Sequence, residues 1–384
     1  MLKTQPAPMA FFSPTSSRYG AENSVLDTLI HLDRTRIRPL VITTEPGPFE
    51  DSARALGLDV VRWPWLRPAT ARRPRALAKA TARLALELRA RNVAIIELCF
   101  LGDYLPVITA GGKLAGCRVI FRHRMHSTSL SAHQAFWLAR VDAIVSITRG
   151  AMNGWTTGRG ASLWRARREA RTHVVPSSRN VSRLAETRRD RQLIRELGVP
   201  DGARVVGMIA AIEPRKRHDL FLNAASLVGV ELPDVCFVIV GRPYTSGAAA
   251  VEYEARVAGW ARATGLGARV VFAGQRSDVP ALMTNLDVLV LPSDHEALGS
   301  TLIEAQALGI PIVASTVDGI PEVLDGGRCG LLVDRQEPRA YSDAILSLLR
   351  DPALAAQLGA RAREGAHRFD GAVLTPQLER VYLA

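Results

Sequence analysis

Short apolar runs of strand length alternate with amphipathic, alanine-rich stretches along almost the whole chain. Most runs are continuous, which is typical of parallel strands that are buried on both faces. The stretches between them, such as residues 218–228 and 339–351, have helical composition. This rhythm predicts an α/β fold in which helices cover both faces of parallel sheets. The predicted strands are MAFFSP, RPLVITT, LDVVRW, VAIIEL, CRVIFRH, AIVSI, THVVPS, RVVGMIA, VCFVIVG, RVVFAG, DVLVLPS, PIVAST and GLLV.

The rhythm restarts near residue 204, after a polar and basic stretch. A chain of 384 residues is long for one domain and comfortable for two. We therefore predict two doubly wound, Rossmann-like domains with a boundary near residues 180–200. Ligands of open parallel sheets bind at the carboxyl ends of the strands, so we expect a ligand in a cleft between two facing domains.

The charge is unevenly distributed along the chain. Residues 1–200 hold 32 Lys and Arg against 15 Asp and Glu, a net +17, whereas residues 201–384 hold 17 against 22, a net −5. A basic half suits a phosphorylated ligand, an anionic membrane or a nucleic acid, or is simply a basic surface. Residues 66–91 predict a basic amphipathic helix. Such a helix can contact a membrane surface peripherally or pack on its own domain, and the sequence leaves both interpretations open.

The four cysteines are far apart and form no Cys-x-x-Cys pair, which argues against a zinc site or a disulfide framework. No apolar run approaches the roughly 20 residues of a membrane-spanning helix, and the N-terminal segment is interpreted as a first strand, not as a signal peptide. We expect a cytoplasmic protein, with peripheral contact at the inner membrane face as an open alternative. The sequence has no Asp-x-Asp pair to hold a metal on a diphosphate, so we expect neither a metal nor another cofactor.

Two acids, Glu296 and Glu304, lie eight positions apart in SDHEALGSTLIEAQALG, directly after a predicted strand. Gly299 and Ser300 precede a stretch of helical composition, so we expect a helix to begin near Ser300 at the carboxyl end of that strand. The free N–H groups and the positive dipole end of such a helix form an anion site. The two acids would bracket a diphosphate, with a nucleoside on one flank and a sugar on the other. A capped helix with two incidental acids is the alternative.

This segment resembles the E-x7-E motif of the retaining glycosyltransferases of family 4, which have the GT-B fold of two Rossmann-like domains. The flanking residues GQRSDVPALMTNLDVLVLPS and GIPIVASTVDGIPEVLDGGRCGLLV resemble the same family, as do VVGMIAAIEPRKRHDLFLNAA, SRYGAENSVLDTL and CRVIFRH. The resemblance is strong over residues 200–335 and weaker before. It implies an acceptor-side domain over residues 1–180, a nucleotide-sugar-binding domain over 181–368, and a C-terminal helix over 369–384 that packs back on the first domain.

The resemblance implies three catalytic residues. Glu296 would contact hydroxyls of the transferred sugar, and Lys216 would neutralise charge on the leaving phosphate. His123 would contact the donor sugar, with His126 as a rival for that role.

The resemblance also implies a set of donor-binding residues. Glu304 would hold the ribose, Gly20 would line the diphosphate side, and backbone near Arg276 would contact the base. The residues whose backbone N–H groups would hold the diphosphate are Gly299, Ser300, Thr301 and Leu302.

Four departures from the family pattern concern the donor, at Ala211, Ala297-Leu298, Ser177 and Asp318. The usual arginine five residues before the lysine is Ala211 here, so Arg215 or Arg217 would replace it, or phosphate binding is weaker. A usual glycine is replaced by Asp318. These changes leave the identity of the donor open.

The implied reaction moves a hexose-type sugar from a UDP- or GDP-sugar to an acceptor hydroxyl on a small molecule, saccharide or lipid, with retention, by front-face attack and without a metal. Preorganised N–H donors and a cation lower such a barrier by about 3–4 kcal/mol per well-placed donor. Retaining glycosidases hold two carboxyls about 5–5.5 Å apart. Eight residues across a loop and a helix turn do not imply that closeness, so Glu296 is not assigned as a covalent nucleophile.

Two alternative functions remain at this stage. One is a nucleotide-sugar epimerase of the same fold. The other is a basic protein that binds nucleic acid or a membrane surface. The aromatic fraction of 6% is low and the aromatics do not interleave with the basic runs, so we expect no nucleic-acid partner.

Overall fold

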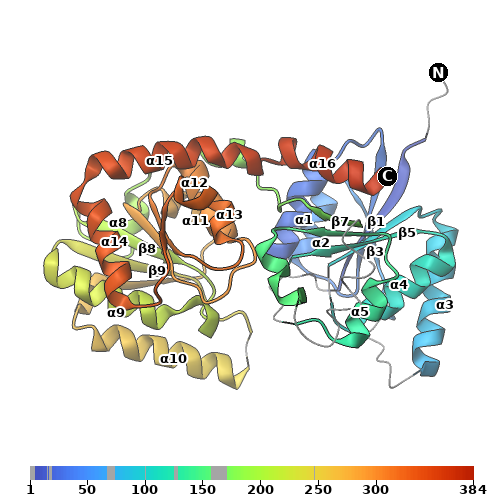
Figure 1. The fold of residues 1–384 in the computed structure, drawn as a ribbon, viewed down its shortest axis with the longest axis horizontal. Coiled ribbons are helices and arrows are strands. Elements are labelled where there is room, and N and C mark those ends of the chain that lie inside the picture. Colours follow the sequence, from blue (N-terminus) through green and yellow to red (C-terminus); the bar gives the residue numbers. More distant parts are fainter. Residues whose placement is uncertain are drawn as a thin grey trace. The chain divides into compact units, whose positions relative to one another are not determined.

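The chain forms two compact units, each built around one parallel sheet (Figure 1). The N-terminal unit comprises Met1–Arg179 and Gly371–Ala384, and the C-terminal unit comprises Asn180–Asp370. The sequence placed the corresponding boundaries at residues 180/181 and 368/369. The computed structural model describes residues 5–14, 16, 20–66, 74–99, 101–124, 129–156, 171–245 and 247–384.

The sheet of the N-terminal unit has the strand order β3-β2-β1-β4-β5-β6-β7, and all its pairings are parallel. Its strands are β1 (Ala7–Ser13), β2 (Ile37–Thr43), β3 (Asp59–Arg62), β4 (Ile95–Leu98), β5 (Arg118–His123), β6 (Ala143–Ser146) and β7 (Thr172–Val174). Helices α1 and α2 pack together, as do α3, α4 and α5. The helices are α1 (Gly20–His31), α2 (Pro48–Ala55), α3 (Pro74–Ala90), α4 (Tyr104–Ala115), α5 (Ala132–Leu138) and α16 (Gly371–Leu383).

The sheet of the C-terminal unit has the strand order β10-β9-β8-β11-β12-β13, again all parallel. Its strands are β8 (Arg204–Ile209), β9 (Val235–Val240), β10 (Val270–Gly274), β11 (Val288–Leu291), β12 (Ile312–Ser315) and β13 (Leu331–Val333). Its helices are α7 (Val181–Ala185), α8 (Gln192–Arg195), α9 (His218–Glu231), α10 (Ala248–Ala263), α11 (Val279–Met283), α12 (Ser300–Leu308), α13 (Ile320–Val323), α14 (Pro338–Arg350) and α15 (Pro352–Ala366).

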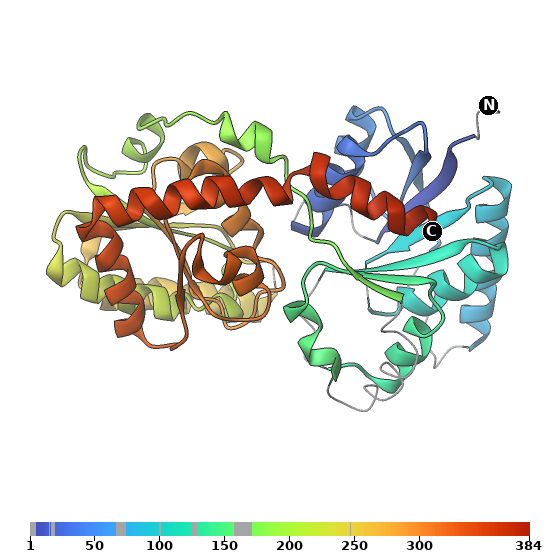
Figure 2. The same ribbon diagram turned by 45° about the horizontal axis from the view of Figure 1, so that its top comes forward.

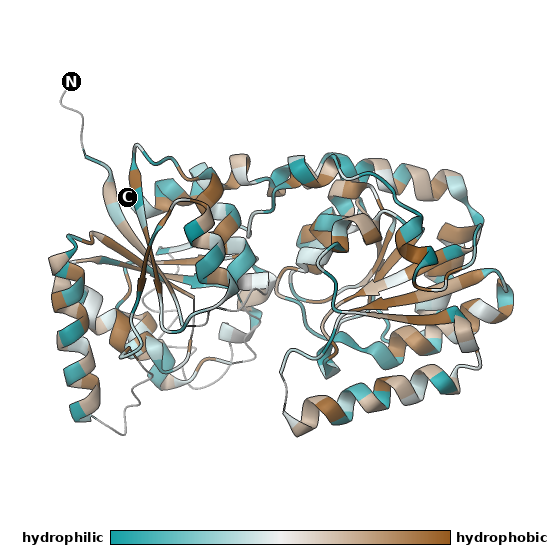
Figure 3. Cartoon of the chain, turned by 180° about the vertical axis from the view of Figure 1, so that it is seen from behind, coloured by the Kyte–Doolittle hydropathy of each residue, from teal (hydrophilic) through white to brown (hydrophobic). Residues whose placement is uncertain are grey.

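The central strands are buried along their whole length. Every residue of β4, β6, β9, β11 and β12 is buried, and the strands of both sheets are coloured mostly as hydrophobic in Figure 3. Burial on both faces explains why their sequences are continuous apolar runs without the alternation of a half-exposed strand. The predicted α/β class with two Rossmann-like domains is confirmed.

The strand order reverses once in each sheet. The reversal lies between β1 and β4 in the N-terminal unit and between β8 and β11 in the C-terminal unit. Loops that leave two strands in opposite directions open a crevice at such a point, and ligands of doubly wound sheets bind there. A ligand site in the C-terminal unit is therefore expected at the loops after β8 and β11.

The C-terminal helix α16 belongs to the N-terminal unit, where it packs on α1 (Figure 2). The hydroxyl of its buried residue Tyr382 donates to Glu97 Oε2 at 2.5 Å and accepts from Arg122 at 3.3 Å. Arg124 pairs with the other Glu97 oxygen at 3.3 Å. Burial, with the neighbouring Glu97 carboxylate, raises the pKa of Tyr382. The hydroxyl therefore stays protonated and ties the helix to the sheet through charge-assisted hydrogen bonds.

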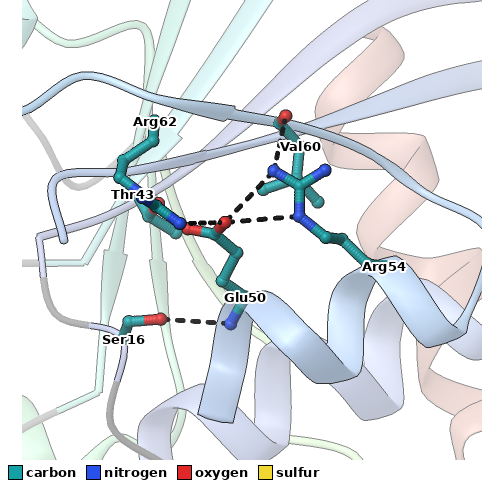
Figure 4. Close-up of polar contacts among 6 residues, drawn as sticks. All are labelled: Ser16, Thr43, Glu50, Arg54, Val60 and Arg62. Carbon is teal, nitrogen blue, oxygen red and sulfur yellow. Dashed lines mark hydrogen bonds and ion pairs between the residues drawn. The ribbon is translucent and has the colours of Figure 1, made fainter. Parts of the chain in front are cut away.

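A buried acid ties α2 to the edge of the N-terminal sheet (Figure 4). Glu50, only 2% exposed, accepts from Arg62 at 2.7 and 3.0 Å and from Thr43 Oγ1 at 3.0 Å. Arg54 adds a contact at 3.1 Å, and the Glu50 N–H donates to Ser16 Oγ at 3.1 Å. The hydrogen bond from Arg62 outweighs burial and, with Thr43 and Arg54, lowers the pKa of Glu50 to about 2.

The predicted basic helix is α3, although residues 67–73 of the predicted range lie outside the described part. Leu84 and Leu88 are buried against the unit, whereas Arg75, Lys79 and Arg83 are exposed on the outer side. Across the described residues, we find no helix with both the length and the apolar character that a membrane span requires.

Candidate functional site

Two loops meet where the strand order of the C-terminal unit reverses. The loop after β8 ends in a 3-10 turn, Pro214–Lys216, and Arg217 then adopts a left-handed conformation with φ 55° before α9 begins. A proline opens the turn, which suits its fixed φ and missing N–H. The loop after β11 runs over residues 292–299 and leads into α12. Both helices thus start at the carboxyl edge of the sheet.

Lys216 and Glu296 join these two loops by an ion pair between Nζ and Oε2. The two side chains are only 10% and 12% exposed, and Arg215 approaches the same carboxylate oxygen at 3.9 Å. Burial acts to raise the pKa of Glu296, but the Lys216 ammonium, together with Arg215 and the Gly299 N–H, outweighs it. The pKa of Glu296 therefore lies below its usual value, and the group is a carboxylate near neutral pH.

The first turn of α12 presents backbone N–H groups at this site. Gly299 precedes the helix with φ 76° and ψ 62°, and as a glycine it offers no side-chain cap to the N–H groups of the first turn. A Cβ at position 299 would lie only 2.9 Å from Leu302 Cδ1, and the backbone there is in the left-handed region. Both facts require a glycine at this position. The Gly299 N–H donates to Glu296 Oε1 at 3.2 Å. An uncapped helix start with a cation beside it is suited to an anion.

Asp318 holds the loop that carries Glu296 through a hydrogen bond to its backbone. The Glu296 N–H donates to Asp318 Oδ2 at 2.9 Å, and the Gly319 N–H donates to the Glu296 carbonyl at 3.1 Å. His295 Nδ1 lies 3.5 Å from the same Asp318 oxygen. Asp318 therefore holds the backbone of Glu296 in place, a role that a glycine at this position could not fill.

Arg217 also links the loops after β8 and β11 through ion pairs. Its guanidinium binds Asp219 at 3.0 Å and Asp294 at 2.8 Å. These hydrogen bonds, the one to Asp219 above all, raise the pKa of Arg217 despite its partial burial. Because its guanidinium already binds both carboxylates, Arg217 has a structural role and is not available to bind a phosphate. Of the two arginines that could replace the one missing at Ala211, Arg215 therefore remains.

The other predicted residues of the C-terminal unit lie further along the same edge. Ser300 and Thr301 form the start of α12, and Glu304 lies one turn later, half-buried. Arg276 follows β10, two strands from β8, and is held by Asp278 at 2.6 and 2.8 Å. The structure thus brings Lys216, Arg215, Glu296 and the α12 start together, and places Arg276 on a separate loop.

His123 and Gly20 lie in the N-terminal unit. His123 is buried at the end of β5, with Nδ1 3.2 Å from Ser146 Oγ and its ring 4.3 Å from that of Trp155. Because the Ser146 hydroxyl donates to the Thr148 carbonyl at 2.8 Å, its oxygen accepts a hydrogen bond from His123 Nδ1. Gly20 is the exposed first residue of α1. The rival His126 lies outside the described residues.

Two acids position the site: the sequence carries no signal for Asp294, and it indicated Asp318 only as a departure from the family pattern, without its role in holding Glu296. Both acids lie in the segment that contains Glu296 and Glu304 or directly after it, but neither belongs to a recognisable motif. Across the described part of the chain, no group of three or more His, Cys, Asp or Glu side chains is arranged to hold a metal ion.

The chain thus has two Rossmann-like units, and in the C-terminal unit the start of α12 lies beside a lysine and a glutamate. Residues 190–365 match the family described as glycosyl transferases group 1.

Individual curated proteins also match part of the chain. The chain is 32% identical over 192 residues to the D-inositol 3-phosphate glycosyltransferase of Corynebacterium glutamicum, a match that covers 49% of this chain and 45% of that protein. It is 37% identical over 156 residues to the protein of the same name from Mycobacterium tuberculosis, covering 40% and 31%. The chain thus spans less than half the length of these two relatives.

The structure of HepE from Anabaena in complex with UDP-glucose superimposes with a TM-score of 0.80. The match covers 97% of this chain and 98% of that one at 20% identity. At this level of identity the likeness shows a shared fold.

Proposed function

We propose that this protein is a retaining glycosyltransferase that moves a hexose-type sugar from a UDP- or GDP-sugar to an acceptor hydroxyl without a metal. One observation carries the proposal: the uncapped start of α12 lies beside the Lys216–Glu296 pair at the strand reversal. A diphosphate matches the chemistry of this place, since it offers oxygens to the N–H groups and charge to the lysine.

The cationic and N–H groups of the site and its carboxylate would act on different parts of the donor. The N–H groups of Ser300 and Thr301 and the Lys216 ammonium would stabilise the negative charge that grows on the leaving diphosphate. Such preorganised donors and cations strengthen their interaction as the bond breaks, which lowers the barrier. Glu296, ionised and fixed by Asp318 and Gly299, would accept hydrogen bonds from sugar hydroxyls and fix the sugar for attack from the same face.

The donor class has support from a protein of the same fold, because HepE was solved with UDP-glucose. For the acceptor, the net charge of +17 on residues 1–200 favours an acidic or phosphorylated hydroxyl compound. The matched relatives are named for D-inositol 3-phosphate, a compound of that kind. We propose a phosphorylated acceptor, either a small molecule or a lipid phosphate.

Thermal stabilisation by a panel of UDP- and GDP-sugars tests the donor assignment, because at equal concentration the ligand of highest affinity raises the unfolding temperature most. One nucleotide sugar should stand out, and its free nucleoside diphosphate should also stabilise. The acceptor panel then holds an inositol phosphate, its dephosphorylated parent and a lipid phosphate in vesicles. Release of nucleoside diphosphate only when an acceptor is present supports transfer. Conversion of the sugar without release would instead identify an epimerase.

The exposed side of α3 allows a separate proposal on membrane contact. Arg75, Lys79 and Arg83 face away from the buried leucines of this helix. We propose that this basic face holds the protein peripherally on anionic lipid. Binding to vesicles that contain phosphatidylserine should fall steeply with salt and be lost when the three residues are replaced by Gln, whereas salt-independent or absent binding would contradict the proposal.

A further inference from the structure

The cations near the proposed diphosphate site differ in what they already bind. The loops after β8 and β9 carry four of them: Arg215, Lys216, Arg217 and Arg242. Lys216 pairs with Glu296, and Arg217 with Asp219 and Asp294. Arg215 pairs with Glu213 at 2.5 Å and donates to the His295 carbonyl at 3.3 Å. Arg242 is exposed and has no acidic partner in the described part of the chain.

The register of β8 and β9 shows where Arg242 lies. The two strands pair in parallel up to Ile209 and Val240. The ladder continues past the strands, because the Ala210 N–H donates to the Val240 carbonyl at 3.0 Å and the Ile212 N–H donates to the Arg242 carbonyl at 2.9 Å. These two hydrogen bonds flank the pair Ala211 and Arg242, which are therefore in register on neighbouring strands. The backbones of such neighbours lie about 4.8 Å apart. Neighbours in register direct their side chains to the same face of a sheet.

A glycine holds this extension of the ladder in place. Gly241 has φ 147°, and a Cβ there would lie 2.0 Å from the Ala210 carbonyl oxygen. Its N–H donates to the Gly274 carbonyl of β10 at 2.8 Å. The backbone at Arg242 is therefore fixed between the ends of β8 and β10, so the guanidinium starts from a defined point next to the loop that carries Lys216.

We infer that Arg242 is a second diphosphate-binding cation, and that it supplies from β9 the charge that an arginine at position 211 would supply from β8. This inference rests on the proposed function and adds a residue to its site. A guanidinium binds phosphate oxygens in pairs, whereas the ammonium of Lys216 acts as a point charge. Two to three negative charges on a nucleoside diphosphate exceed what Lys216, already paired with Glu296, can neutralise.

Calorimetric titration with UDP, UMP and uridine, and with the guanosine series, tests the inference on Arg242→Ala. A hydrogen-bonded charge contact is worth about 1.5–3 kcal/mol, so the diphosphate should bind about 10- to 100-fold more weakly. The monophosphate should lose less, and the nucleoside nothing. The double variant Ala211→Arg/Arg242→Ala should recover most of the diphosphate affinity, because the two positions are neighbours in register.

The control is Arg335→Ala, an exposed arginine after β13, three strands from β8 on the same edge of the sheet. This variant should bind the diphosphate as the wild type does. Undiminished diphosphate binding by Arg242→Ala would overturn the inference, as would an equal loss for the nucleoside or a double variant without recovery. If the wild-type protein binds neither UDP nor GDP, it is the proposed function that fails.

Discussion

Lys216 and Glu296 form a buried ion pair although they lie 80 positions apart in the chain. The lysine comes from the loop after β8 and the glutamate from the loop after β11, so the pair joins the loops on both sides of the strand reversal. The cation proposed for the phosphate thus holds the carboxylate proposed for the sugar. Removing either partner leaves a nearly buried charge without compensation, which is costly.

Replacing Glu296 by Gln tests the sugar contact. Glutamine has nearly the same size and shape, so the fold should remain intact, whereas the charge is lost; its one amide oxygen can accept from Lys216 or from the Gly299 N–H, but not from both. We expect the turnover number to fall by about 100-fold or more, since a preorganised electrostatic contact is typically worth that much. Steady-state kinetics and circular dichroism check this, with the exposed Glu337→Gln on the loop after β13 as the control. Unchanged turnover in Glu296→Gln would remove its assignment.

The contact between the two residues predicts that their effects are coupled. Lys216→Met, Glu296→Gln and the double variant form a cycle in which the sum of the single losses in nucleotide-sugar binding should exceed the loss in the double variant. Residues in direct contact usually show an interaction energy of about 0.5–3 kcal/mol. Titration calorimetry on the four proteins measures it. Additive losses would mean that the two side chains act on the donor independently.

Sequence reasoning found the parts of this site that depend on local chemistry. Gly299 before a helical stretch predicted the start of α12, because a glycine allows the left-handed turn into the helix. The partner of Ala211 could not be found in this way, because Arg242 becomes its neighbour only through the register of β8 against β9. The hydrogen bond from Glu296 to Asp318 likewise needs the order β11-β12 in the sheet. Apolar periodicity predicts that strands exist, but not which side chains their order brings together.

Gly241→Ala should destabilise the C-terminal unit. The added Cβ would lie 2.0 Å from the Ala210 carbonyl oxygen, and the backbone has a φ of 147°, so the ends of β8 and β9 must move apart. We expect a loss of about 1–3 kcal/mol. The control Gly259→Ala lies within α10, where the nearest atom is 3.9 Å away, and should stabilise the protein by about 0.5–1 kcal/mol. Urea unfolding measures both, and equal midpoints for the two variants would contradict the steric argument.

Glu50 predicts acid sensitivity of the N-terminal unit. Its pKa falls from 4.5 to about 2 in the folded protein, so its contribution is complete above pH 4.5 and is lost as the pH falls toward 2. The partners Arg62 and Arg54 are 43% and 53% exposed and therefore partly screened, so we expect about 1–3 kcal/mol. Glu50→Gln should flatten the acid limb of stability measured by denaturant unfolding. The control Glu45→Gln changes an exposed acid of the same unit and should leave that limb unchanged, and a wild-type slope in Glu50→Gln would refute the prediction.

His218 predicts that the C-terminal unit loses stability at a higher pH. Its side chain is fully buried at the start of α9, and neither ring nitrogen has a hydrogen-bond partner in the described part of the chain. Burial, with the adjacent Lys216, lowers the pKa of His218 from 6.5 to about 4. Between these values the unfolded chain binds a proton that the folded one does not, so stability falls as the pH drops from 6.5 to 4.

The loss associated with His218 should be on the order of 3 kcal/mol at pH 4, and His218→Leu should remove it, because leucine fills a similar volume and carries no proton. Calorimetry between pH 7 and pH 4 separates this transition from the acid limb of Glu50, which begins where the histidine window ends. The exposed His367→Gln serves as the control and should keep the wild-type slope. If His218→Leu loses stability over this pH range as steeply as the wild type, the buried imidazole is not the group that makes the C-terminal unit sensitive to acid.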